Sequence, residues 1–295
     1  MGTVELPVVV GVDGSDAASD ALDWAAEAAG RRGLPLRIVH ASLWERYEGY
    51  VPGTAADRPA ERLHSEAVLA TAAERAGRRV PALKVMTDLA ADDAVTALLR
   101  AGQSAEALVV GSRGRGEFAS LLLGSVGLGI AARAQCPVVV VRGRPENVHG
   151  GTNRVVVGIA ERERPGEQEP TPPSAAVAFA LREARLRGGE LVAVHAWRCA
   201  GPEDHGARED HARRAAELLD EALGGATAAG LAPVPVAHRP VEGSARKALL
   251  DASAHADLLV VGARRRQGHF GMQLGLVNHA VLHHAKCPAA VVPVS

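Results

Sequence analysis

The stretch GSRGRGEFASLLLGSVGLGIAARAQCPVVVV, residues Gly111–Val141, occurs a second time in altered form as GARRRQGHFGMQLGLVNHAVLHHAKCPAAVV, residues Gly262–Val292. The two stretches align without gaps, and 11 of their 31 residue pairs are identical. A second pair of segments, Ser19–Ala41 and Ser174–Ala196, ends in Val-His-Ala in both copies. Because the blocks follow one another in the same order in each half, the sequence predicts a duplicated domain.

Each half alternates short apolar runs with longer helix-like segments. The run Val8–Val12 is rich in β-branched residues, which is typical of a strand buried on both faces. Strands that alternate with helices predict right-handed crossovers and a parallel sheet. The predicted fold class is therefore α/β, with two tandem Rossmann-like domains, each a five-stranded parallel sheet flanked by helices. In the first half the predicted strands are Val8–Val12, Leu36–Ala41, Ala82–Thr87, Ala107–Val110 and Val138–Val141, and the predicted helices are Ala17–Arg32, Arg58–Arg78, Ala94–Gly102 and Leu122–Ala134.

The ends of the first helix and the boundary between the halves both carry local signals. Ser15-Asp16 is a candidate N-cap for the alanine-rich first helix, and Gly33 is a candidate terminator. Arg144–Asn153, which contains a proline and several turn-forming residues, is predicted to be a linker. The predicted domains therefore span residues 1–144 and 152–295.

Composition excludes several classes of protein. Hydrophobic residues make up 47% of the chain and charged residues 23%, which excludes a disordered chain. A net charge of −1 and few aromatic residues argue against nucleic-acid binding. Three scattered cysteines support neither a disulfide framework nor a zinc cluster. With no secretory signal and no run of about 20 apolar residues, we expect a cytoplasmic protein without a membrane segment.

Two strand ends carry the chemistry of a binding site. Gly11-Val12-Asp13-Gly14-Ser15 places a carboxylate among small residues, and Gly111-Ser112-Arg113-Gly114 is followed nine residues later by Gly124-Ser125. Glycines let the backbone approach an anion, and the N–H groups that open a helix favour phosphate. The pattern predicts a nucleotide with its phosphates on the second loop and its nucleoside near Asp13. The alternatives are a glycine-rich turn that only packs tightly and, for Asp13, a capping role for which Ser15 competes.

This pattern resembles that of the universal stress protein family, in which Gly-x2-Gly-x9-Gly-Ser/Thr marks the ATP-binding members. Gly111, Gly114, Gly124 and Ser125 match every fixed position. The resemblance spans nearly the whole chain as two tandem copies. It implies an adenine nucleotide alpha hydrolase-like sheet of order 3-2-1-4-5 that binds ATP, with or without Mg²⁺.

The resemblance also implies which residues contact the nucleotide. Asp13 would contact the nucleoside beside the backbone of Gly11 and Val12, and main-chain groups of Ala41 would face the adenine. Family members often carry Thr or Ser at the position of Gly127, so one hydroxyl is missing here. The full implied set is Gly11, Val12, Asp13, Ala41, Val110, Gly111, Arg113, Gly114, Gly124, Ser125, Val126 and Gly127.

The second half departs from the motif. Arg265 replaces the counterpart of Gly114, Leu276 that of Ser125, and Ala160 that of Asp13. An insertion that begins at Glu161 lengthens the first loop. A lost hydroxyl and a bulky side chain both weaken a phosphate site, so we expect the second half to bind ATP weakly, differently or not at all.

Histidine and cysteine positions have simpler interpretations. His40 and His195 end the second strand of each half, which favours a packing role over catalysis. His279 and His283 lie four residues apart, but no third ligand has suitable spacing, so no metal site is predicted. Cys136 and its counterpart in the second half precede the last strands and are predicted to be buried, unreactive thiols.

Three functions stay open at this point. The first is a regulatory, ATP-binding stress-response protein with at most slow ATP hydrolysis. The second is an enzyme that cleaves or transfers a nucleotide, although no catalytic group recurs at the strand ends. The third is a dimerising module with a vestigial site. Because unpaired edge strands invite association, we expect Val138–Val141 and Ala290–Val294 to pair as an internal pseudo-dimer, with a further homodimer.

Overall fold

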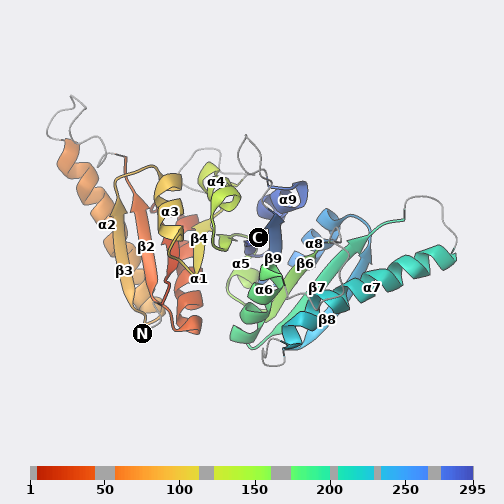
Figure 1. Ribbon diagram of the computed structural model, residues 1–295. Helices are drawn as coiled ribbons and strands as arrows, with labels where there is room; N and C mark the ends of the chain where they lie inside the picture. Colours follow the sequence, from red (N-terminus) through yellow and green to blue (C-terminus); the bar gives the residue numbers. More distant parts are fainter. Residues whose placement is uncertain are drawn as a thin grey trace. The chain divides into compact units, whose positions relative to one another are not determined.

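The computed structural model describes residues 5–43, 57–112, 123–160, 174–199, 205–228, 234–264 and 274–294. These residues divide into two compact units, the first ending at Arg142 and the second beginning at Gly143. Each unit is a parallel sheet with helices packed against it (Figure 1).

The described residues of the first unit form five strands and four helices. Its strand order is β3-β2-β1-β4-β5, as the family resemblance implies, and all neighbouring strands are parallel, as the alternation of strands and helices predicts. Helices α1 and α2 contact each other, as do α3 and α4, so the helices form two layers. The elements are β1 Val8–Gly11, α1 Asp16–Arg32, β2 Leu36–Ala41, α2 Asp57–Arg79, β3 Val85–Ala90, α3 Ala94–Gly102, β4 Ala107–Gly111, α4 Ser125–Arg133 and β5 Val138–Val141.

The second unit repeats this topology. Its strand order, β8-β7-β6-β9-β10, is the order of the first unit with each strand replaced by its counterpart, and its strands are also parallel. The elements are α5 Pro145–Val148, β6 Arg154–Ile159, α6 Ala175–Leu186, β7 Glu190–Trp197, α7 His205–Ala228, β8 Val236–Glu242, α8 Ala245–Ser253, β9 Leu258–Arg264, α9 Leu276–His284 and β10 Ala289–Val294. The predicted pairing of the two edge strands, β5 and β10, stays a prediction.

The central strands form the core, as their composition predicts. The valines of β1 and β5 are buried, and the face of α1 that packs on the sheet is built from buried alanines and Trp24. Helix α1 begins as predicted: Ser15 is its N-cap and accepts a hydrogen bond from the backbone N–H of Ala18 at 3.2 Å. It ends at Gly33 in the left-handed conformation, with φ of 66°.

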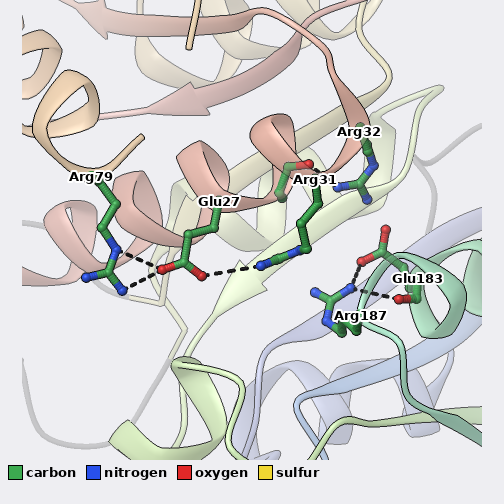
Figure 2. A network of polar contacts seen from close by, with 7 residues as sticks. Glu27, Arg31, Arg32, Arg79, Glu183 and Arg187 are labelled. Atoms are coloured by element: carbon green, nitrogen blue, oxygen red, sulfur yellow. Dashed lines mark hydrogen bonds and ion pairs between the residues drawn. The ribbon is translucent and has the colours of Figure 1, made fainter. Parts of the chain in front are cut away.

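Arginine–carboxylate pairs stabilise helices in both units (Figure 2). In the first unit, Glu27 of α1 accepts hydrogen bonds from Arg79 of α2 at 2.8 Å and from Arg31, one turn further along α1, at 3.4 Å. In the second unit, Glu183 and Arg187 form an ion pair within one turn of the α6 region, and both side chains are almost fully buried. A buried carboxylate is tolerated when a partner of opposite charge accompanies it.

Strand β3 lies further along the chain than predicted. The prediction was Ala82–Thr87, whereas the strand runs from Val85 to Ala90. A turn closed by the bond from Leu83 N–H to the Val80 carbonyl delays its start, and pairing with β2 sets its register. Because β3 is an edge strand with much of its surface exposed, its sequence lacks the apolar signal that marks the inner strands.

The predicted linker, 144–153, packs on the second unit. It contains α5, where Asn147 is 1% exposed and donates a hydrogen bond to the Ala256 carbonyl at 2.8 Å. The buried carboxylate of Asp257 accepts hydrogen bonds from the backbone N–H groups of Thr152 and Asn153. The ends of the predicted domains, residues 144 and 152, stay a prediction.

Candidate functional site

The strand order reverses between β1 and β4, and we use the term crevice for the region outside the carboxyl ends of these two strands. These neighbouring strands pair from Val8 with Ala107 to Val10 with Val109. Strand β2, which follows β1 in the sequence, pairs with β1 on the side away from β4. Strand β5, which follows β4, pairs with β4 on the side away from β1. In open parallel sheets, ligands bind outside the strand ends at such a reversal of strand order. The predicted site residues Gly11 and Gly111 end these two strands.

Asp13 follows β1 in a tight turn. One of its carboxylate oxygens, Oδ1, accepts hydrogen bonds from the Ser15 backbone N–H at 3.0 Å and from the Ser15 hydroxyl at 2.6 Å. Gly14, between them, has φ of 80°. Ser15 therefore caps α1 and also holds Asp13 in one orientation. Within the described residues the second oxygen, Oδ2, accepts no hydrogen bond, so it can face a ligand.

The end of β2 is tied to the residue that follows β1. His40 is buried, and its Nδ1 lies 2.8 Å from the Val12 carbonyl oxygen, to which a protonated Nδ1 donates. The Val12 N–H donates to the Val39 carbonyl at 2.9 Å. Since His195 makes the same contact with the Ile159 carbonyl at 2.9 Å, the predicted packing role of both histidines is confirmed. This bond fixes the strand end at which Ala41, half-buried, terminates β2.

Packing alone requires a glycine at position 111, and Gly11 is also closely packed. A Cβ atom on Gly111 would lie 2.4 Å from the Ala17 carbonyl oxygen, because β4 ends against the first turn of α1. A Cβ atom on Gly11 would lie 2.9 Å from Cδ1 of Leu98, a buried residue of α3. The sequence alone did not identify these contacts. The contact with the Ala17 backbone shows that tight packing constrains Gly111, whatever the crevice binds.

The amino end of α4 lies next to the end of β4. Gly124 is the N-cap residue, and its N–H donates to the Ser112 carbonyl at 3.0 Å, which joins the helix start to the residue after β4. No side chain of the described residues caps the helix. Ser125 is exposed at its first position, Val126 is half-buried, and the free N–H groups of this turn together with the helix dipole favour an anion. Helix α4 begins later than the predicted Leu122, which lies outside the described residues.

The remaining predicted residues divide between the core and the undescribed loop. Val110 is buried in β4, and Gly127 is buried in α4, where an added Cβ atom would lie 2.9 Å from Cδ1 of Leu123. Arg113 and Gly114 lie outside the described residues. The structure therefore brings the ends of β1, β2 and β4 and the start of α4 to one edge of the sheet.

The second unit keeps the scaffold of this crevice but not its polar groups. A Cβ atom on Gly158 would meet Leu249 at 3.1 Å, as one on Gly11 would meet Leu98. Ala160, the counterpart of Asp13, is exposed, and Leu276, the counterpart of Ser125, is 91% exposed at the first position of α9. Asn278, the counterpart of Gly127, donates from Nδ2 to the Gly262 carbonyl at 3.0 Å, a contact that the sequence analysis missed.

The sequence also places histidine and cysteine side chains outside the two strand ends. The rings of His279 and His283 stack with their centroids 4.2 Å apart, and among the described residues no group of three His, Cys, Asp or Glu side chains could hold a metal ion. Burial raises the pKa of the Cys136 thiol to about 11, and Cys287 is fully buried, which confirms the predicted burial of both thiols. No helix in the described part of the chain is long and apolar enough to cross a membrane.

Comparison with known proteins identifies the family. The model of the universal stress protein family matches residues 6–142 and again residues 154–293. The chain belongs to the universal stress protein family. The resemblance that the motif indicated is thereby confirmed, including its tandem form.

Relatives of the same family cover nearly the full chain. Universal stress protein Rv2005c of Mycobacterium tuberculosis is 35% identical, with 96% of each chain covered. The crystal structure of a universal stress protein from Archaeoglobus fulgidus is 18% identical, covers 97% of this chain and 98% of its own, and has a TM-score of 0.66, which confirms the fold. A shorter solved universal stress protein, in complex with cAMP, is 30% identical, covers 47% of this chain and 98% of its own, and has a TM-score of 0.35.

Proposed function

We propose that the first unit binds ATP in the crevice between β1, β4 and α4, and that nucleotide occupancy is the regulated property of this universal stress protein. The proposal rests on the contact between the end of β4 and the start of α4. The Gly124 N–H bond to the Ser112 carbonyl sets an uncapped helix start directly beside the end of β4. Backbone donors at a helix start are suited to phosphate oxygens.

In this proposal, different residues contact the phosphates, the ribose and the adenine of ATP. The N–H groups at the start of α4 and the Ser125 hydroxyl hold the phosphates, and Arg113 and Gly114 complete that side. The unpaired oxygen of Asp13 is fixed by Ser15 in a position where it can accept a hydrogen bond from a ribose hydroxyl. Ala41 offers main-chain groups to the adenine at the end of β2. ATP, with or without Mg²⁺, is the proposed ligand.

Binding rather than efficient catalysis is the proposed role. The titratable side chain that the described part of the crevice presents is Asp13, and its Oδ1 is already engaged by Ser15. General acid–base catalysis needs a positioned group whose proton can be transferred at the reacting atoms. The expected ATP turnover is slow, and a signal carried by ATP occupancy would then persist. A homodimer is proposed as the assembly in which that signal is read.

Retention of nucleotide tests the proposal directly. The protein is purified without added nucleotide and denatured, and the supernatant is chromatographed; released ATP is expected. Isothermal titration of the nucleotide-free protein then compares Ser125→Leu, which copies Leu276, with Ser125→Thr, which keeps the hydroxyl. Loss of one hydrogen bond to a charged group is expected to weaken ATP binding by roughly 10-fold or more in the leucine variant, with little change in the threonine variant.

Two results would contradict the proposal. One is a wild-type protein that retains no ATP and shows no heat of binding when ATP is added. The other is unchanged affinity in Gly114→Arg, which introduces the bulky residue that the second half carries at Arg265. Incubation with radiolabelled ATP and magnesium measures turnover separately, and rapid hydrolysis would favour the enzyme interpretation.

A further inference from the structure

The amide of Asn278 links the start of α9 to the end of β9, whereas its counterpart in the first unit, Gly127, has no side chain and lies against Leu123. Nδ2 of Asn278, in the first turn of α9, donates to the Gly262 carbonyl in β9 at 3.0 Å. The equivalent positions in the first unit are Gly127 and Gly111, neither of which has a side chain. The side chain of Asn278 therefore occupies the space between the strand and the helix start, where the proposed phosphate site of the first unit lies.

The remainder of the second scaffold matches the first closely. Gly158 packs against Leu249 and Val261 as Gly11 packs against Leu98 and Val110. The imidazole of His195 holds the backbone after β6 as that of His40 does after β1. The two crevices therefore differ in their side chains, at Ala160 on the nucleoside side and at Leu276 and Asn278 on the phosphate side, and a general distortion of the second fold does not account for the difference.

The side chain at the first position of α9 also differs from that of α4 in a way that disfavours phosphate. Leu276 is 91% exposed where the first unit presents the Ser125 hydroxyl. A large apolar side chain at the helix entrance offers no donor, and a phosphate placed against it would lose hydration without a replacement hydrogen bond. The hydrogen bond of Asn278 satisfies the amide without any ligand, so a phosphate would have to displace an existing bond.

We infer that Asn278 closes the second crevice to phosphate and limits the chain to one ATP. This inference rests on the proposed function of the first unit. It assigns Asn278 as the residue that determines which of two nearly identical scaffolds accepts a nucleotide. The second unit then contributes its surface, and not a second nucleotide, to the action of the protein.

Introducing the amide into the first unit tests the inference. Gly127→Asn places the same side chain opposite the Gly111 carbonyl, and ATP affinity is expected to fall by at least about tenfold. Gly127→Ala is the matched control, because both variants add a Cβ atom that meets the flexible end of Leu123 at 2.9 Å. The alanine variant measures the effect of the Cβ atom alone, and the asparagine variant is expected to bind ATP at least about tenfold more weakly than the alanine variant. Thermal unfolding without nucleotide checks that both variants fold.

The reverse experiment removes Asn278 from the second unit and measures how many ATP molecules each chain binds. The variant Ala160→Asp/Arg265→Gly/Leu276→Ser/Asn278→Gly is expected to bind two ATP per chain, whereas Ala160→Asp/Arg265→Gly/Leu276→Ser, which keeps Asn278, is expected to bind one. Equal loss of affinity in Gly127→Asn and Gly127→Ala would overturn the inference, because Leu123 and not the amide would then be the cause. Two ATP bound by the wild-type chain would also overturn it while leaving the proposed function intact. A wild-type chain that binds none would contradict the proposed function, and the inference would fail with it.

Discussion

Replacement of Gly111 by alanine should destabilise the first unit even when no nucleotide is present. The added Cβ atom would lie 2.4 Å from the carbonyl oxygen and 2.6 Å from the carbonyl carbon of Ala17. Ordinary contact begins at 3.4 Å, so the strand end and the helix would have to separate by 3.4 − 2.4 = 1.0 Å. Helix α1 packs on the sheet through alanines that are fully buried, so it cannot move by this amount without opening a packed face.

The expected size of the effect follows from that clash. Overpacking a rigid core costs about 1–3 kcal/mol. For a unit of this size each kcal/mol lowers the melting temperature by roughly 2–4 °C, so a fall of roughly 2–12 °C is expected in the first unit. Gly77→Ala is the matched control, because a Cβ atom there meets nothing within 4 Å and Gly77 lies inside α2. That variant should gain about 0.5–1 kcal/mol.

Scanning calorimetry of nucleotide-free protein measures both variants. Removal of nucleotide matters, because a bound ligand would add its own stabilisation and hide the packing term. If Gly111→Ala unfolds at the wild-type temperature, the close approach of β4 to α1 does not require a glycine at position 111. Ligand binding alone would then have to explain the glycine.

Three smaller predictions concern single contacts. Asp93→Ala removes the N-cap of α3, whose carboxylate accepts from the N–H groups of Val95 and Thr96 at 3.1 Å, and should cost about 1 kcal/mol in urea unfolding; an unchanged midpoint would contradict this role. Asn147→Ala should cost about 1–3 kcal/mol in the same assay by leaving the buried Ala256 carbonyl without its partner, and full stability would show that the segment is not held by this bond. Burial raises the pKa of Cys136 from 9.0 to about 11, so the unfolded thiol ionises first and the free energy of unfolding should fall as pH rises between those values; rapid labelling of Cys136 by a thiol reagent at pH 8 in the native protein would contradict its burial.

The elements that the sequence predicted correctly are those with local signals. The valine runs of β1 and β5 are buried on both faces, and Ser15 and Gly33 lie at the two ends of α1 as their side-chain chemistry requires. The edge strand β3 was misplaced by three residues because its position depends on pairing with β2, a contact distant in sequence. Tertiary register overrides weak local preference at an edge.

The candidate site likewise has features that local sequence signals predicted and features that depend on contacts distant in sequence. The spacing of Gly111, Gly124 and Ser125 correctly predicted that a strand end and a helix start lie together. The spacing could not show that Gly111 also makes room for the Ala17 carbonyl, because that contact depends on how α1 crosses β4. The amide bond of Asn278 was missed for the same reason, although its alignment with Gly127 was a signal that could have been followed.

The most direct test of the central claim is to locate bound ATP along the chain. Photolabelling of the full chain with 8-azido-ATP, followed by digestion and mass spectrometry of the labelled peptides, reports which unit holds the adenine. We expect the label only in peptides from the first family match, residues 6–142, and its loss when unmodified ATP competes. Label that persists under competition, or that lies within residues 154–293, would contradict the account.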